Sequence, residues 1–233
     1  MRIALCFSGQ PRSFRKGYEY YARNLLDKHD VDVFIHTWEC DDSEDVIKWY
    51  KPVAHRIEQQ LPASIDSKYT HTPNAEKWPP RFTVSALYST FQTCLLKINR
   101  EVLTRQYDWV IKTRFDFALP ISIPFEHLQK QRVYMPPCRT KAFGDWLGND
   151  QFAIGDSDTM NVYMSTYLRM DRYYNSGVEM IGEEMLRSTL NEFGRERIGY
   201  LDMPPPFPPG PHNGTPHFLI RDDYNQWTKS LKN

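Results

Sequence analysis

The sequence predicts an α/β protein with a single domain, in which a mostly parallel sheet is flanked by helices. Short apolar runs typical of strands alternate with segments that carry apolar residues at helical spacing. This alternation is typical of a mostly parallel sheet covered on both faces. The 233 residues suffice for one well-packed domain, and 40% hydrophobic with 25% charged residues is an ordinary composition for one.

The charge balance and the cysteines narrow the function classes. Acidic and basic side chains number 29 each, so no overall field recruits nucleic acid or an anionic membrane. The apolar run at the N-terminus is too short for a transmembrane segment, which needs roughly 20 residues, or for a secretory signal. The cysteines are scattered without a CxxC pair, which indicates neither a zinc site nor a disulfide framework. We therefore expect a cytoplasmic protein without a nucleic-acid partner.

The first half of the chain carries three strand patterns, three helical patterns and a proline-rich loop at 62–80. Ser13 and Ser43 are expected to cap the first two helices. The third helix is expected to bury the stripe Leu87, Phe91, Leu95 and Ile98. The expected strands are 2–9, 31–38 and 53–60, and the expected helices are 13–29, 42–52 and 81–106.

The second half continues the alternation and ends in a proline-rich tail. Ser157 is expected to cap one helix and Gly194 to end the other. Proline density disfavours helix and central strand in the tail. We expect residues 1–203 to form the domain and residues 204–233 to form an extended arm packed on it. The expected strands are 107–116, 131–137, 150–156 and 197–203, and the expected helices are 157–174 and 182–194.

Several of the expected apolar strands have polar residues at their C-terminal ends. If the strands are parallel, these residues meet at the carboxyl edge of the sheet, where α/β proteins bind ligands. Solvated strand ends are often polar in any case, which is the structural alternative. The residues concerned are Ser8, Gly9 and Arg12 after the first strand, His36, Thr37 and Trp38 on the second, and Arg114 and Asp116 on the strand at 107–116.

Four motifs in order carry a resemblance to a known family: "ALCFSGQPRSF", "VDVFIHTW", "YDWVIKTRFDFAL" and "NDQFAIGDSDTMNVY". Together they resemble the small nucleotide-sugar glycosyltransferases of the GT-A type found in bacterial polysaccharide clusters and large DNA viruses. The resemblance covers roughly residues 1–200. It implies a GT-A (Rossmann-like) fold, a nucleotide-sugar donor, a glycan acceptor and a role in polysaccharide biosynthesis.

The resemblance also implies a divalent metal, usually manganese, with magnesium as the alternative. In GT-A enzymes an Asp-x-Asp motif and the donor diphosphate bind this ion. Here the motif reads Arg114-Phe115-Asp116, so only Asp116 remains as the expected metal ligand. One carboxylate can serve a hard cation that is also bound by phosphate and water. Arg114 could instead bind phosphate or hold Asp116 in place, so strict metal dependence is open.

The other strand-end residues are expected to bind the nucleotide. Gly9 lets the backbone approach a ligand, Ser8 offers a hydroxyl, and Arg12 can counter phosphate charge. His36, Thr37 and Trp38 close the second strand, and the indole of Trp38 can stack on a base. Tyr88 and Gln92 lie one helical turn apart and could line the donor site, although core packing is the more ordinary role for Tyr88.

Two acidic positions are candidates for a catalytic base. The segment 145–156 contains Asp145, Asp150 and Asp156, and in the resembling enzymes the Asn-Asp pair ahead of such a strand belongs to the active site. Asp150 is therefore expected in the same pocket as Asp116, as the base for inverting sugar transfer. Glu183, followed by Glu184 at a helix start, is the second candidate. Retention at the anomeric carbon would require no such base.

The sequence thus predicts an enzyme, a hexosyl- or pentosyltransferase that moves a sugar from a nucleoside-diphosphate sugar to a glycan hydroxyl. The alternative is a non-catalytic GT-A domain that binds nucleotide or glycan without turnover. The missing first aspartate of the metal motif favours the alternative, and the acidic residues around Asp150 favour the enzyme.

Overall fold

A seven-stranded mixed sheet forms the centre of the protein in the computed structural model, which describes residues 1–71, 75–76, 78–136, 149–206 and 218–220. Its order is β3-β2-β1-β4-β6-β5-β7, and all the pairings are parallel except those of β6 with β4 and β5. The strands are β1 (Arg2–Ser8), β2 (Asp30–Trp38), β3 (Ala54–Glu58), β4 (Trp109–Thr113), β5 (Val133–Met135), β6 (Phe152–Gly155) and β7 (Ile198–Tyr200). The predicted α/β class with a mostly parallel sheet is confirmed.

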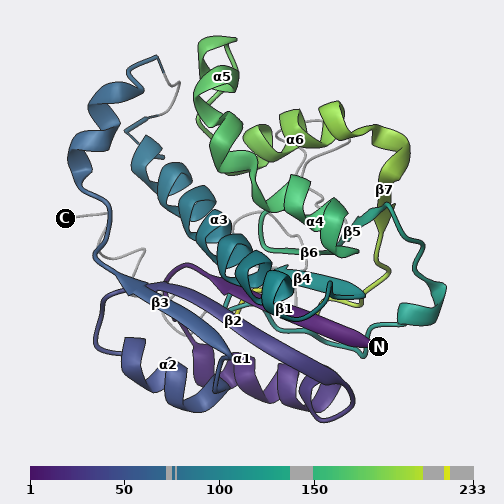
Figure 1. Cartoon of the computed structure of the whole chain (residues 1–233). Coiled ribbons are helices and arrows are strands. Elements are labelled where there is room, and N and C mark those ends of the chain that lie inside the picture. The colour runs from purple at the N-terminus through teal and green to yellow at the C-terminus, as the bar shows by residue number, and fades with distance from the viewer. Residues whose placement is uncertain (72–74, 77, 137–148, 207–217, 221–233) are drawn as a thin grey trace.

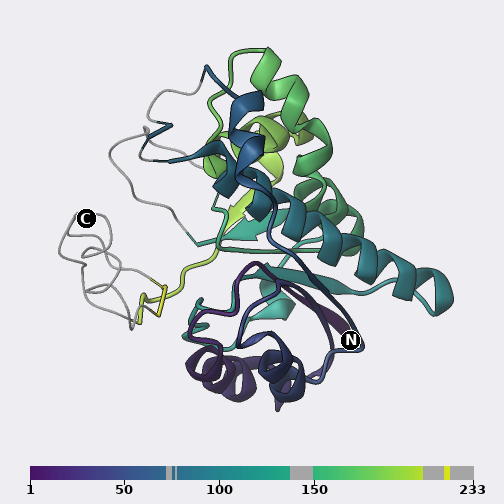
Figure 2. The same cartoon turned by 90° about the vertical axis from the view of Figure 1, so that its left-hand side faces the viewer.

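Helices cover both faces of the sheet (Figures 1 and 2). Helices α1 and α2 lie on one face, and α3, α4 and α6 lie on the other. Among the described residues, no helix is long and apolar enough to cross a membrane. The helices are α1 (Phe14–Tyr21), continued by a π-helical segment (Ala22–Leu26), α2 (Ser43–Tyr50), α3 (Pro80–Leu103), α4 (Ser157–Met164), α5 (Met170–Asn175) and α6 (Gly182–Phe193), with 3-10 segments at Ala63–Lys68, Phe125–His127, Thr166–Arg169 and Arg195–Arg197.

The alternation of side chains along the central strands builds two separate cores. In β1, Ile3, Leu5 and Phe7 pack under α1 and α2, while Ala4 and Cys6 face the α3 side. Successive side chains of a strand point to opposite faces of the sheet, so a strand buried on both faces is apolar throughout. This explains why the central strands show continuous apolar runs.

The strand expected at 107–116 ends at Thr113 in the structure, and Arg114–Asp116 forms a turn. The side chain of Phe115 inserts into the α1 side, where its ring stacks on Phe7 with centroids 5.0 Å apart and an interplanar angle of 11°. Lys112 faces the opposite side and lines a pocket under α3 and α6. The segment therefore alternates between an apolar anchor and charged groups.

Four of the expected helix details differ from the structure. Ser13 makes no capping hydrogen bond with its side chain, and Ser43 lies within α2, where its hydroxyl bonds the backbone of Cys40. Helix α4 is capped by Asp156, whose carboxylate accepts from the backbone N–H of Thr159 at 3.0 Å, and not by Ser157. The helix expected over 157–174 is divided into α4, a 3-10 segment and α5.

The prediction of an apolar stripe on the buried face of α3 is also wrong in part. Leu87 is buried, but Leu95 is 36% exposed, whereas Ser89, Thr93 and Lys97 are buried. These polar residues are buried because they find partners there; Lys97, for example, donates to Glu101, Ser157 and Asn161. Helical periodicity counts apolar residues and therefore missed a buried face that is largely polar.

The tail touches the domain where the structure describes it. Phe218–Ile220 pairs with the segment after β4: the backbone N–H of Ala118 donates to Phe218, and that of Ile220 donates to the carbonyl of Asp116 at 2.7 Å. Most of the run from Pro204 to Pro216, and so the predicted course of the arm, lies outside the described residues.

Gly17 allows α1 to approach the Arg114–Asp116 turn closely, because a Cβ atom there would collide with the carbonyl oxygen of Phe115. We predict that Gly17→Ala lowers the free energy of unfolding by about 1–3 kcal/mol, since overpacking outweighs the gain in helix propensity. Glu19→Ala, at an exposed position of the same helix, is the control. Urea unfolding measures both, and equal stability of the two variants would contradict the close contact.

Candidate functional site

The carboxyl ends of β1, β2 and β4 meet at one edge of the sheet. Ser8 is in register with His36, and Phe7 is in register with Thr113. The chain runs from β1 to β2 on one side and to β4 on the other, so the strand order reverses between β1 and β4. In open α/β sheets ligands bind at such a reversal, outside the carboxyl ends of the strands. The predicted convergence of polar strand ends is therefore present in the fold.

Five charged residues gather at the end of β4, and we call them the charged cluster: Lys112, Arg114, Asp116, Asp150 and Glu183. Arg114 interacts electrostatically with all three carboxylates, and Lys112 interacts with two of them. Asp150 reaches this edge because it precedes β6, which runs antiparallel to β4. Glu183 belongs to the first turn of α6. The charged cluster therefore contains predicted site residues from three distant segments of the chain, together with Lys112.

Arg114 and Asp116 form a two-pronged ion pair. The Nε and Nη2 groups of Arg114 donate to the two oxygens of Asp116 at 2.8 and 2.7 Å. The Asp116 side chain is 7% exposed, and that of Arg114 is 30% exposed. Burial alone would lower the pKa of the guanidinium, but the charge and hydrogen bonds of Asp116 outweigh this effect and raise the pKa. The guanidinium of Arg114 is therefore positively charged at neutral pH.

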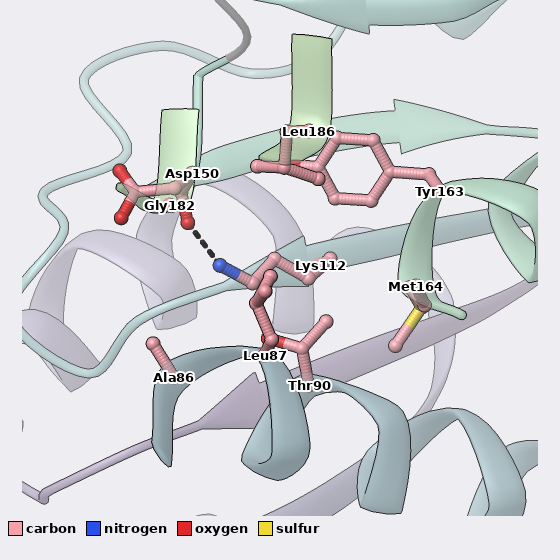
Figure 3. A pocket seen from close by; sticks show the side chains of 9 residues that line it. All are labelled: Ala86, Leu87, Thr90, Lys112, Asp150, Tyr163, Met164, Gly182 and Leu186. Carbon is pink, nitrogen blue, oxygen red and sulfur yellow. Dashed lines mark hydrogen bonds between the residues drawn. The ribbon is translucent and has the colours of Figure 1, made fainter. Parts of the chain in front are cut away.

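Lys112 is a buried cation in the wall of a small pocket. Its Nζ donates to the backbone carbonyl of Asp150, and the carboxylate of Asp150 points away from it (Figure 3). Burial lowers the pKa of Lys112 from 10.5 to about 8, although the charge of Asp150 opposes the shift. At pH 7 most of the ammonium is therefore still protonated.

Asp150 is held by the segment that precedes it. The side-chain carbonyl of Asn149 accepts from the backbone N–H groups of Gln151 and Phe152 at 2.8 and 3.2 Å. The hydroxyl of Tyr163 donates to the backbone carbonyl of Asn149 at 2.5 Å. These bonds fix the Asn-Asp turn against α4, so the position of Asp150 is set by its neighbours.

Glu183 is the carboxylate with the most perturbed proton affinity in the charged cluster. Burial and the neighbouring charge of Asp150 raise its pKa from 4.5 to about 7, against the opposing effect of Arg114. A carboxylate of this kind gains and loses a proton near neutral pH, which is the property of a general acid or base.

The pocket beside the cluster is narrow, with a volume of about 20 Å³. This is room for about one water molecule. Lys112 and Asp150 line it together with apolar residues of α3, α4 and α6 (Figure 3). A ligand larger than water therefore contacts this end of the sheet from outside the pocket, or after the walls move.

The predicted nucleotide-binding residues of β1 are partly covered by α3. The hydroxyl of Ser8 bonds that of Thr90 at 3.1 Å. Gly9 has a left-handed backbone (φ 99°), and its N–H donates to Ser89 at 2.7 Å and to His36 at 3.2 Å. No atom lies within 4 Å of the position where a Cβ of Gly9 would be. The backbone at Gly9 therefore faces open space.

The β2 residues are buried under α3 or within the sheet. His36 is fully buried, with Nδ1 bonded to Ser89 and Nε2 to Glu58. Burial lowers the pKa of this imidazole, although Glu58 opposes the shift. Trp38 is 3% exposed and stacks on Tyr88, so its ring is covered by protein here. This geometry gives His36 and Trp38 structural partners and no ligand-facing surface.

Thr37 and Arg12 have different surroundings. Thr37 is buried, and its hydroxyl is the buried side-chain polar atom without a hydrogen-bond partner among the described residues. Arg12 is exposed on the loop after β1, and its guanidinium donates to the side chain of Gln10 at 2.9 and 2.7 Å. The structure does not bring Arg12 into the hydrogen bonds of the charged cluster.

The remaining candidates take part in local contacts. Tyr88 donates to Glu58 at 3.1 Å, and Gln92 accepts from Arg56 at 2.7 Å. Asp156 caps α4, and Glu184 pairs with Arg187 at 3.2 Å. Asp145 lies outside the described residues. Of the acidic candidates that the structure describes, Asp150 and Glu183 are those brought to the charged cluster with Asp116.

Asp116, the expected metal ligand, is already paired with Arg114. Both oxygens of Asp116 already accept hydrogen bonds from Arg114. In the described part of the chain, no group of three or more His, Cys, Asp and Glu side chains could hold a metal ion. Lys112 and Arg114 also place positive charge where a cation would sit. These residues by themselves do not fit a divalent ion, and manganese binding stays a prediction.

Sequence reasoning missed Lys112 as a part of the site. The signal for Lys112 was a lysine within a strand that is otherwise apolar, since such a residue is rarely buried without a reason. Asn149 was expected at the site only through the resemblance, as the first residue of the Asn-Asp pair, and its hydrogen bonds could not be read from the sequence because they depend on the turn that it closes.

Comparison with known proteins gives no further identification. The chain matches no protein-family model and no curated protein sequence. The functional interpretation therefore depends on the geometry of the charged cluster and on the resemblance of the four motifs.

The raised pKa of Glu183 predicts a pH-dependent stability. Its folded pKa of about 7 exceeds the ordinary 4.5, so its contribution is favourable below pH 4.5 and is lost as the pH rises through 7. Glu183→Gln should therefore match the parent near pH 4.5 and be more stable at pH 8, by roughly 3 kcal/mol at most.

Urea unfolding of the parent and of Glu183→Gln at both pH values tests this prediction. Glu184→Gln, which removes the adjacent carboxylate from the same helix start, is the matched control. A stability difference between the parent and Glu183→Gln that does not change with pH would show that Glu183 is not buried beside Asp150 as described.

Proposed function

We propose that the protein is a GT-A type glycosyltransferase. In this proposal it moves a sugar from a nucleoside-diphosphate sugar to a hydroxyl group of a glycan acceptor, with inversion at the anomeric carbon. The observation that carries the proposal is the meeting of Glu183 and Asp150 with Lys112 and Arg114 where the strand order reverses. The resemblance of the motifs supports the same chemistry.

The proposed reaction needs a base and a centre of positive charge. Glu183 takes the proton of the acceptor hydroxyl while that oxygen forms a bond to the anomeric carbon. The bond from this carbon to the diphosphate oxygen breaks, and the diphosphate leaves with the electron pair. Arg114 and Lys112 face the growing negative charge of this leaving group, and such stabilisation is a large part of catalysis.

Glu183 suits the role of base better than Asp150 for a physical reason. A general base acts best when its pKa lies near the working pH, and the pKa of Glu183 is raised to about 7. Asp150 contributes to this shift through its negative charge. The proposal therefore reverses the order expected from the sequence, with Glu183 as the base and Asp150 as its tuning neighbour.

A nucleotide-binding module without turnover is the second candidate. The missing first aspartate of the metal motif, where Arg114 stands instead, favours it. A radiolabelled transfer assay with nucleotide sugars and mixed glycan acceptors separates the candidates, since the module binds nucleotide but transfers no sugar.

A thermal-shift screen of nucleoside diphosphates and nucleotide sugars tests the binding that both candidates share. At about 100 times the dissociation constant, a ligand adds roughly 2.7 kcal/mol to the free energy of unfolding. The screen is run with EDTA and with manganese. Stabilisation by no nucleotide under either condition would contradict the proposed function.

The base assignment predicts different outcomes for neighbouring carboxylates. Glu183→Gln should bind donor normally and lose transfer activity by about 10²–10⁴-fold, because general-base catalysis contributes that much. Glu184→Gln, the adjacent carboxylate, should retain activity. Asp150→Asn should stay active and shift the acidic limb of the kcat/KM profile to lower pH, since the pKa of Glu183 falls when a neighbouring negative charge is removed.

Initial rates of the variants from pH 5 to 9 measure these effects. An inactive Asp150→Asn together with an active Glu183→Gln would move the role of base to Asp150. Activity in both variants would indicate retention, which NMR of the product anomer tests directly.

A further inference from the structure

The Arg114–Asp116 pair is built as a rigid unit. The guanidinium and the carboxylate meet through two parallel hydrogen bonds, an arrangement that fixes the plane of the arginine as well as its position. The carboxylate is almost buried, whereas the arginine keeps 30% of its side chain exposed. The aspartate is therefore the inner partner and the arginine the outer one.

The turn that carries this pair is fixed from three directions. Phe115 is fully buried and packs on Phe7 and Tyr50. Its carbonyl lies against Gly17 of α1. The carbonyl of Asp116 accepts from the backbone N–H of Ile220 in the tail. A backbone held in this way sets the Arg114 side chain in one place before any ligand arrives.

Arg114 retains donors for a ligand. Its bonds to Asp116 use Nε and one side of Nη2, and among the described residues the Nη1 amino group donates no hydrogen bond, so it can serve another acceptor. Lys112, two residues earlier, is buried but close enough to Arg114 to interact with it electrostatically, so it adds positive charge at the same edge. The open space beside the Cα of Gly9 lies across the strand reversal, just after the end of the neighbouring β1, although the N–H of Gly9 is already bonded to Ser89 and His36. Positive charge and open space thus meet at the edge where a diphosphate would bind.

A metal at Asp116 would require a different arrangement. The carboxylate would have to exchange its two bonds from Arg114 for a bond to the ion. The guanidinium would then lose its partner beside the new positive charge, in a site that already contains Lys112. Leaving a buried ion without its partner is costly. The geometry therefore opposes the role that the Asp-x-Asp resemblance implies for Asp116.

We infer that Asp116 is a positioning residue for Arg114, and that Arg114 binds the donor diphosphate without a divalent metal, with the charge of the buried Lys112 behind it. This inference depends on the proposed function for the identity of the ligand. It assigns the positive charge that the leaving diphosphate needs to two side chains of the protein.

The first test compares binding with and without metal. The nucleoside diphosphate that stabilises the parent most, from UDP, GDP, ADP and CDP, is titrated by calorimetry in EDTA and in manganese. We expect dissociation constants that agree within about threefold. Binding that appears only with manganese overturns this inference and leaves the proposed function in place. Binding under neither condition overturns both.

The second test is a double-mutant cycle at the pair. Asp116→Asn removes the charge and one acceptor of the two-pronged bond, and should weaken nucleotide binding by about tenfold or more in EDTA. Arg114→Lys keeps the charge but loses the fork. In the Arg114→Lys background, Asp116→Asn should change the affinity less than about twofold, because the two-pronged bond through which Asp116 orients the side chain is already lost.

A purely structural role for Asp116 predicts an equal loss in both backgrounds, which would overturn the inference. A loss caused by Asp116→Asn that appears only with manganese would restore Asp116 as a metal ligand. Asp45→Asn, which breaks the exposed ion pair between Arg15 of α1 and Asp45 of α2, is the matched control and should not change binding. Circular dichroism melting of each variant confirms that the protein measured is folded.

Discussion

The ion pair between Arg114 and Asp116 is the interaction on which the site depends. It forms because the chain leaves β4 and turns at once, with Phe115 inserted into one core and its two charged neighbours directed to the opposite side. The close approach of α1 at Gly17 and the pairing of Ile220 both act on this turn. Packing on one face of the sheet thus determines the electrostatics on the other.

The charged cluster holds groups whose proton affinities are shifted in opposite directions by the same burial. The ammonium of Lys112 loses its proton more readily, with a pKa lowered to about 8, and the carboxyl of Glu183 keeps its proton longer, with a pKa raised to about 7. Both shifts represent free energy that the fold gives up at neutral pH. Such costs are typical of sites that serve function at the expense of stability.

The sequence predicted most of the fold, because strand and helix patterns depend on local periodicity. All the expected strands are present, and the convergence of Ser8, His36 and Arg114 at one edge followed from parallel pairing. Local sequence patterns could not predict that α3 covers the ends of β1 and β2. Ser89 and Thr90 bond His36 and Ser8 across more than fifty residues of chain, and nothing in either segment specifies its partner.

The direction of a single strand decides which carboxylates share the site. A wholly parallel sheet would put the start of β6, and with it Asp150, at the edge opposite to Arg114. Because β6 runs antiparallel to β4, with Phe152 opposite Thr113, its first residues lie beside the end of β4. Asp156, at the other end of β6, is for the same reason removed from the cluster and caps α4 instead. Asp150 therefore lies near Lys112 and Arg114, where Asp116 also lies, only because the sheet departs from parallel pairing at β6.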